Sequence, residues 1–296
     1  MTIGTAAHPP LTLAARLARR PRVNAYWILV APALVLMLVF YLYPLGQVLW
    51  ISVTEPKPGI DNYGLLFSSA SIHKMLITTA RICAITTLVT LLLGYVVAYS
   101  LVHARPKAQR WIFLGVVLPL WISALVRAFA WVTLLRREGV INGALTGAGI
   151  VDQPLSLLWN EFAICVGMVH YMLPYAILPL YANMREIDQR TIAAARGLGA
   201  GPFQAFRRVF LPLSLPGIVG AGVLVFILSL GFYITPAILG GGKTLMITEY
   251  ISTQILDLLR WGPATMLATS LILTVLAMMW MLGRVVDLRK LFGAGG

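Results

Sequence analysis

The sequence predicts an all-α integral membrane protein with six transmembrane helices, from its composition, its apolar runs and the placement of its basic residues. Of its 296 residues, 59% are hydrophobic and 11% are charged, and the mean hydropathy is +0.85. That much apolar surface exceeds what the core of one soluble domain can bury. The apolar residues form runs of about 20, the length that crosses a bilayer as a helix, and most basic residues lie between the runs.

Six apolar runs give the expected spans. In chain order they are residues 26–50, 77–101, 111–135, 162–182, 213–235 and 263–281. The first follows a basic stretch, as in a signal peptide, but it is longer than a signal peptide's apolar part and has a bulky end at 41–50. We therefore interpret it as an uncleaved anchor, and divide the chain into a basic arm at 1–25, a transmembrane domain at 26–285 and a tail at 286–296.

The basic residues predict the orientation of the spans. The 23 Lys and Arg residues outnumber the 10 Asp and Glu residues, a net charge of +13 that in a soluble protein would indicate nucleic-acid binding. With a cytoplasmic N-terminus, fifteen basic residues fall in inward segments, seven in outward segments, and Arg127 lies inside a span. This bias places both termini in the cytoplasm and leaves no need for a nucleic-acid partner. The outward residues are Lys57, Lys74, Arg81, Arg136, Arg137, Lys243 and Arg260.

The three outward segments that follow the odd-numbered spans are rich in glycine and proline, which predicts loops. The second contains Gly143, Gly147 and Gly149. The third contains AILGGGKT at 237–244, which imitates a phosphate-binding loop, except that Ala237 replaces its first glycine. Because no strand–helix context surrounds it and it is expected outside, we interpret it as a flexible glycine turn.

The inward segment at 183–212 is too long for a simple connection. Its alanine-rich part at 192–198 favours a helix, Gly199 suits a bend, and Pro202 suits the start of a second helix. An aromatic stripe at spacings i, i+3 and i+7 lies beside two arginines, which indicates either buried packing or a docking surface. The residues are Phe203, Phe206, Phe210, Arg207 and Arg208.

Residues 191–212, TIAAARGLGAGPFQAFRRVFLP, resemble the EAA loop of ABC importer permeases, which reads Glu-Ala-Ala, three residues, Gly, nine residues, Ile-x-Leu-Pro. Ala193 stands where the family has its glutamate. The replacement removes the carboxylate for a polar contact and leaves the helix–glycine–helix geometry intact. The resemblance implies that the segment couples to an ATPase subunit through Ala193, Ala194, Ala195, Gly199, Phe203, Phe206, Arg207, Val209, Leu211 and Pro212.

Two further blocks are similar to permeases of the spermidine/putrescine type. They are LPLWISALVRAFAWVTLLRREGVIN at 118–142 and FYITPAILGG at 232–241. The resemblance implies a type I ABC importer permease fold in the bacterial inner membrane and import of a polyamine or related amine. An opine, an amino-acid derivative or another anionic or zwitterionic solute is the alternative substrate class.

The same resemblance implies the partners of the chain. They are a cytoplasmic ABC ATPase dimer, a second homologous permease subunit that makes a heterodimer, and a periplasmic solute-binding protein. ATP and Mg are then bound by the ATPase, so the chain itself is expected to be no enzyme and to hold no cofactor or metal. Neither Cys83 nor Cys165 has the spacing of a disulfide framework or metal site.

Arg127 lies halfway along the third span, where an unpaired guanidinium costs at least about 2.5 kcal/mol. It either bonds helix-end carbonyls or a partner subunit, or it lines the route of the solute. A cation route needs carboxylates and aromatic faces. The candidates for the path are Arg127, Trp131, Phe232, Tyr233 and Glu249, although each also fits a solvated charge or interfacial aromatic.

Two other classes of membrane protein are less consistent with the sequence. An ion-coupled secondary transporter needs acidic coupling residues within its spans, and the expected spans hold almost none. A membrane-embedded enzyme needs a cluster of catalytic polar residues at one interface, and no such pattern is visible.

Overall fold

The computed structural model describes residues 25–285, so most of the predicted arm and the predicted tail lie outside the described residues. The first helical run consists of α2 (Ala25–Met37), the π-helix η1 (Leu38–Leu42) and α3 (Tyr43–Thr54). Contacts divide the chain after Trp50. Between 29 and 44 every side chain of this run is exposed, as in a helix whose partners are lipid or another protein.

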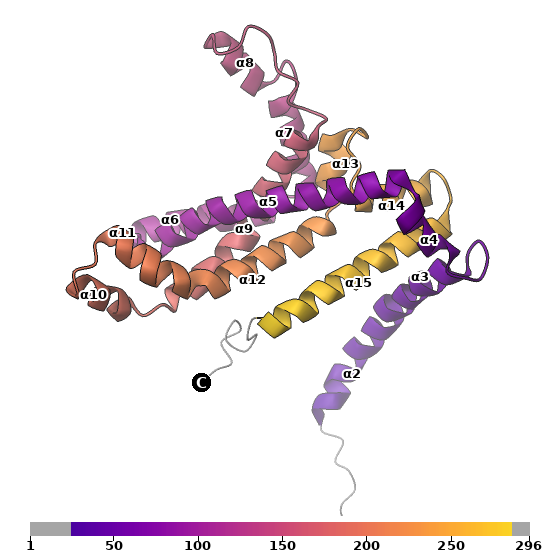
Figure 1. The fold of residues 1–296 in the computed structure, drawn as a ribbon, viewed down its shortest axis with the longest axis horizontal. Coiled ribbons are helices and arrows are strands. Elements are labelled where there is room, and N and C mark those ends of the chain that lie inside the picture. Colours follow the sequence, from indigo (N-terminus) through magenta and orange to yellow (C-terminus); the bar gives the residue numbers. More distant parts are fainter. Residues whose placement is uncertain (1–24, 286–296) are drawn as a thin grey trace, which may run out of the picture. The chain divides into compact units, whose positions relative to one another are not determined.

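The part of the chain from Ile51 to Val285 is a helical assembly (Figure 1). Its elements, in order, are α4 (Asp61–Ser68), α5 (Ala70–His103), α6 (Pro106–Val117), η2 (Leu118–Trp121), α7 (Ala124–Leu135), α8 (Val140–Gly147), α9 (Glu161–Arg185), α10 (Gln189–Gly197), α11 (Pro202–Ala205), η3 (Phe206–Phe210), α12 (Leu211–Leu230), α13 (Ile234–Gly240), α14 (Ile247–Leu256) and α15 (Trp261–Val285).

Five helices of the described chain are long and apolar enough to cross a membrane, and the number rises to six if one bent pair counts as a span. The bent pair corrects the predicted third span at 111–135, which is not one helix. The chain turns by 101° between Trp121 and Ala124. Pro119 lies in the 3₁₀ turn η2, and Ser123 caps α7 by accepting a hydrogen bond from the Leu125 amide at 3.3 Å. Both features end one helix and begin another.

The predicted fifth span also has different ends. The helix runs without a break from Pro202 to Leu230 through the π-helix η3, and the chain breaks at Gly231 before α13 begins at Ile234. A hydropathy window at 213–235 misses both ends because it does not register the polar first turns or the glycine stop.

Of the three predicted loops, the one around Gly143 and Gly147 was wrong, because a short helix occupies it. Residues 55–60 are irregular as predicted, and the predicted glycine turn is present at Gly241 and Gly242, with φ of +56° and +71°.

Gly143 and Gly147 both lie in α8. Asn142 holds this helix by donating to the carbonyls of Arg136 and Leu155 and by accepting from the Leu155 amide at 2.8 Å. A buried side chain with three such bonds outweighs the low helix propensity of glycine.

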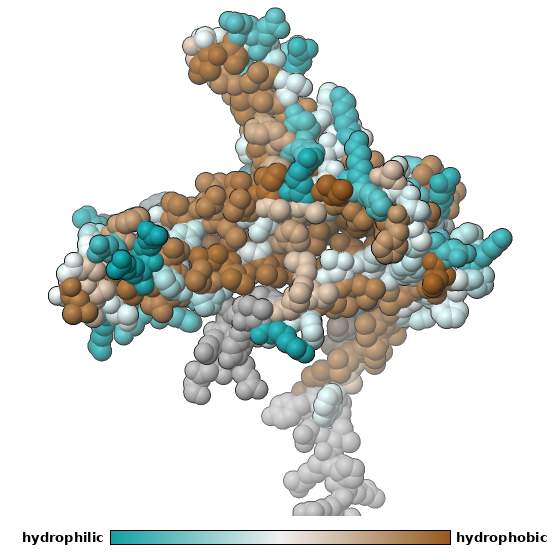
Figure 2. Space-filling model, viewed as in Figure 1, coloured by the Kyte–Doolittle hydropathy of each residue, from teal (hydrophilic) through white to brown (hydrophobic). Residues whose placement is uncertain are grey.

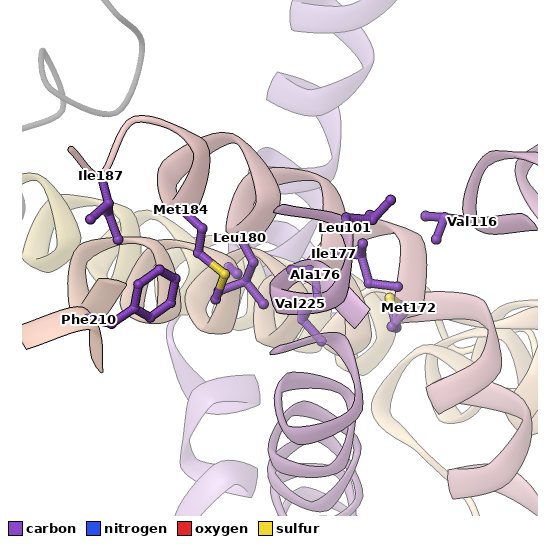
Figure 3. Close-up of a cluster of buried hydrophobic side chains, with 12 residues drawn as sticks. Leu101, Val116, Met172, Ala176, Ile177, Leu180, Met184, Ile187, Phe210 and Val225 are labelled. Carbon is purple, nitrogen blue, oxygen red and sulfur yellow. The ribbon is translucent and has the colours of Figure 1, made fainter. Parts of the chain in front are cut away.

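The core lies where α5, α9 and α12 pack together (Figure 3). Small residues allow the close approach of α5 and α9: a Cβ at Gly94 would lie 3.2 Å from the Ala176 Cβ. Figure 2 shows hydrophobic residues along the flanks of the helices and hydrophilic ones at the α10–α11 end and at the tip of α8. The buried residues of this core are Ala98, Leu101, Val116, Met172, Ala176, Ile177, Leu180, Met184, Ile187, Phe210, Ala221 and Val225.

Candidate functional site

The segment from α10 to η3, residues 189–210, has the predicted helix–glycine–helix form. The Asp188 carboxylate caps α10 by accepting a hydrogen bond from the Arg190 amide at 2.9 Å. Gly199 has φ +88°, a left-handed conformation that residues with a side chain avoid, and Pro202 lies in the first turn of α11. The predicted bend and the predicted start of the second helix are confirmed.

The aromatic stripe of this segment is divided between the surface and the core. Phe203 is 72% exposed, Phe206 is half-buried and Phe210 is 2% exposed. The rings of Phe206 and Phe210 pack edge-to-face with the ring of Tyr99 in α5. Their centroids lie 5.6 Å and 5.2 Å from the Tyr99 centroid. Tyr95 completes the contact by a hydrogen bond between its hydroxyl and Ser214 Oγ at 3.0 Å. The two inner rings therefore bind α11 and η3 to α5, and Phe203 remains available on the surface.

A cavity of about 200 Å³ lies between α10, α11 and the end of α5. Its wall includes Ala193, Arg196, His103 and Phe206. The other predicted coupling residues lie on the same segment or the helix that continues it, Ala194, Arg207 and Pro212 being exposed and Ala195, Val209 and Leu211 half-buried. Their contact with an ATPase remains a prediction.

Arg127 and the side chains around it form a second candidate site, the Arg127 cluster, made of Arg127, Trp131, His170, Tyr171, Tyr175 and Phe232. Arg127 is 8% exposed, and its Cζ lies 4.2 Å from the centroid of the Tyr171 ring, well within the range of a cation–π contact. Its Nε and Nη1 are buried and have no hydrogen-bond partner among the described residues. Carbonyls at helix ends therefore do not hold these two groups.

Aromatic rings from three parts of the chain contact Tyr171 or lie near it, beside this guanidinium. The Tyr171 ring lies 4.3 Å from the Phe232 ring and stacks on Tyr175 at 5.9 Å between centroids. Trp131, one turn beyond Arg127, donates from Nε1 to His170 Nδ1 at 3.1 Å. Arg127, Trp131 and Phe232 of the predicted path thus come together, and the structure adds three residues that the sequence reading missed. The spacing of Tyr171 and Tyr175, four residues apart on one helix face, is the signal that could have found two of them.

Tyr233 and Glu249, the other residues predicted for the path, lie at and beyond the break after α12. Tyr233 is 44% exposed, and its hydroxyl is 3.5 Å from Ser252 Oγ. Glu249 is 8% exposed in α14, and its Oε2 has no partner among the described residues. Burial raises the pKa of the Glu249 carboxyl, and a hydrogen bond from the Met246 backbone opposes the rise. Thr248 ties α14 to the break by donating to the Phe232 carbonyl at 2.8 Å.

Apolar helices of spanning length, one of them broken beside a buried cation, indicate a multi-pass membrane protein with a functional site inside its spans. Residues 90–288 match the family described as binding-protein-dependent transport system inner membrane component, and the chain belongs to that family.

Curated relatives agree with this assignment. The chain is 35% identical over 217 residues to the spermidine/putrescine transport system permease protein PotB of Haemophilus influenzae, covering 73% of this chain and 75% of the relative. It is 29% identical over 223 residues to the protein of the same description from Escherichia coli, covering 75% of this chain and 81% of the relative. The chain is therefore a permease subunit of an ABC importer in the inner membrane, and its family is one of transport proteins and not of enzymes.

Solved structures agree with the fold. A bacterial ABC transporter that imports the acidic polysaccharide alginate has a chain with a TM-score of 0.70 at 21% identity, covering 91% of this chain and 99% of that one. A second structure of an alginate ABC transporter, with an alginate-bound periplasmic protein, gives a TM-score of 0.72 at 19% identity and covers 87% and 92%. The predicted all-α fold of a type I ABC importer permease is confirmed.

Proposed function

We propose that this chain forms part of the path by which an ABC importer moves a polyamine, or a related amine, into the cell. The observation that carries the proposal is the 35% identity to a permease described as a spermidine/putrescine transport protein, over about three quarters of both chains. The aromatic rings of the Arg127 cluster support it, because tyrosine and phenylalanine faces attract cationic amines.

The family and the surface of the α10–η3 segment support the proposed partners. A binding-protein-dependent importer needs a periplasmic solute-binding protein, and we propose a second homologous permease subunit and two copies of a cytoplasmic ATPase that bind ATP and Mg. Leu198 is 90% exposed and Phe203 is 72% exposed beside the arginines of the segment, a combination typical of a docking surface. The exposed side of α10 and α11 is the proposed contact with the ATPase.

The proposed mechanism is a movement of α10 and α11 when ATP closes the ATPase dimer. Because α11, η3 and α12 form one continuous helix, the movement would reach the break at Gly231 without a hinge between them. The permease pair would thereby change from inward-facing to outward-facing. The excess of basic residues on this side favours a cytoplasmic location for the segment and for both termini.

A second candidate function is import of an anionic or zwitterionic solute such as an opine. The observation that favours it is the buried guanidinium of Arg127 with two hydrogen-bond donors that lack partners among the described residues. A carboxylate is the usual partner of such a group.

Uptake into proteoliposomes tests the two candidates. The complete importer, with its binding protein and internal ATP, is expected to accumulate labelled putrescine or spermidine, and excess octopine is expected not to compete. A matched preparation without ATP is the control. Failure to accumulate either amine, with accumulation of octopine under the same conditions, would replace the first candidate with the second.

A further inference from the structure

We propose that the face of Tyr171 is a binding subsite for the ammonium group of the transported amine, and that Arg127 occupies this subsite until the amine displaces it. The inference rests on the proposed function, because it concerns the same path and the same class of solute. It assigns a separate role to each partner: Tyr171 binds the cation, and Arg127 is a tethered competitor for the same ring.

The first support is the way in which the guanidinium is held. Cζ of Arg127 lies 4.2 Å from the Tyr171 centroid, and Nε and Nη1 have no acceptor within the described chain. A buried guanidinium normally pairs with a carboxylate through two hydrogen bonds, which hold it more tightly than a ring does. The contact observed here is therefore one that another cation can replace.

The second support is that no ion pair joins Arg127 to a carboxylate of the described chain, the buried Glu249 of α14 included. In α7, α9, α12 and α13 the one acidic residue is Glu161, at the start of α9, and it forms an ion pair with Arg81. A cation at Tyr171 is therefore held without a carboxylate from these helices. The ring that holds a guanidinium under these conditions has the property that an alkylammonium ion needs.

The third support is that the rings pack against one another, whereas no hydrogen bond of the described chain holds Nε or Nη1 of Arg127. Tyr171 lies against Phe232 and Tyr175, and all three are half-buried, so their faces are partly open. Arginine has a long side chain with several rotatable bonds, and it moves more readily than packed rings do. The arrival of a second positive charge would repel the guanidinium and free the ring.

Direct binding of labelled putrescine to the assembled permease–ATPase complex in nanodiscs tests the inference. Arg127→Gln removes the competing charge and is expected to tighten putrescine binding about tenfold. Arg127→Lys keeps a cation on the tether and is expected to lack this gain. Tyr171→Leu removes the ring face and is expected to weaken binding about tenfold and to cancel the gain when combined with Arg127→Gln.

Tyr181→Leu is the matched control, because Tyr181 lies on the same helix as Tyr171 and its hydroxyl accepts a hydrogen bond from Nε2 of Gln109, which is outside the cluster, at 2.9 Å. It is expected to leave putrescine binding unchanged. If the Tyr171→Leu complex fails to assemble, Phe232→Leu is the second variant. It removes the ring that packs against Tyr171, and it is also expected to weaken putrescine binding.

Three results would overturn the inference. Equal or weaker putrescine binding by an assembled Arg127→Gln complex would show that the arginine is structural or binds the solute itself. A gain that survives in the double variant would place the subsite elsewhere. If the wild-type importer takes up no amine, the proposed function fails and this inference fails with it. If amine uptake is normal but the Arg127→Gln complex binds putrescine no more tightly than the wild type, the inference alone fails.

Discussion

Aromatic rings pack together in both the α10–η3 segment and the Arg127 cluster, but the hydrogen bonding of the polar groups beside the rings differs. Phe206 and Phe210 contact Tyr99, and the Tyr95 hydroxyl pairs with Ser214. In the cluster, by contrast, Arg127 keeps two buried donors without a partner among the described residues. The paired groups of the first region explain its role as a structural support, whereas the unpaired buried donors of Arg127 need an explanation, which the proposed exchange with a solute cation supplies.

The largest effect is expected from a substitution in the core of the α10–η3 segment. Phe210→Ala removes a buried ring and is expected to lower the free energy of unfolding by about 3–5 kcal/mol. Thermal unfolding of the purified chain in detergent measures it. The matched control is Phe203→Ala, which removes an exposed ring of the same stripe and should leave the unfolding temperature unchanged. Equal loss in both variants would mean that the stripe is not divided between core and surface.

A smaller effect separates backbone conformation from packing in the same segment. Gly199→Val forces a left-handed residue to carry a branched side chain, which costs about 1–3 kcal/mol, although no atom lies within 4 Å of the added Cβ. Transport and substrate-stimulated ATP hydrolysis are expected to fall. Gly201→Val is the control, because Gly201 has φ −65° and equally open space. Normal coupling in the Gly199 variant would remove the need for the bend.

The smallest effect tests how much the polar part of the support contributes. Tyr95→Phe deletes the hydroxyl that pairs with Ser214 and keeps the ring next to Phe206. The expected loss of unfolding free energy is about 0.5–1.5 kcal/mol. A urea titration of the detergent-solubilised chain measures it, with Tyr63→Phe, which loses a hydroxyl contact to Ser52, as the comparison. A loss much larger than this range would show that the hydrogen bond, more than the rings, holds α12 to α5.

The sequence predicted the α10–η3 segment better than the Arg127 cluster for a physical reason. Gly199 and Pro202 act on their own backbone, so local rules predict the bend and the helix start. Arg127 could be assigned to a span, but its contact with Tyr171 joins α7 to α9, and no local pattern specifies that pairing. The sequence did not predict the break before α7, because Pro119 and Ser123 lie in a run whose average hydropathy stays apolar.

The helix from Pro202 to Leu230 has a thermodynamic consequence. It begins in the proposed docking segment and ends two residues before Phe232, whose ring lies against Tyr171. Suppose that one conformation of this helix favours binding of the ATPase at one end and of the solute at the other. The two binding equilibria are then coupled reciprocally. A solute that raises the permease's affinity for the nucleotide-bound ATPase tenfold must itself bind tenfold more tightly when that ATPase is bound. The same helix would then make solute selectivity a function of the nucleotide state, even though no nucleotide touches this chain in the proposed mechanism.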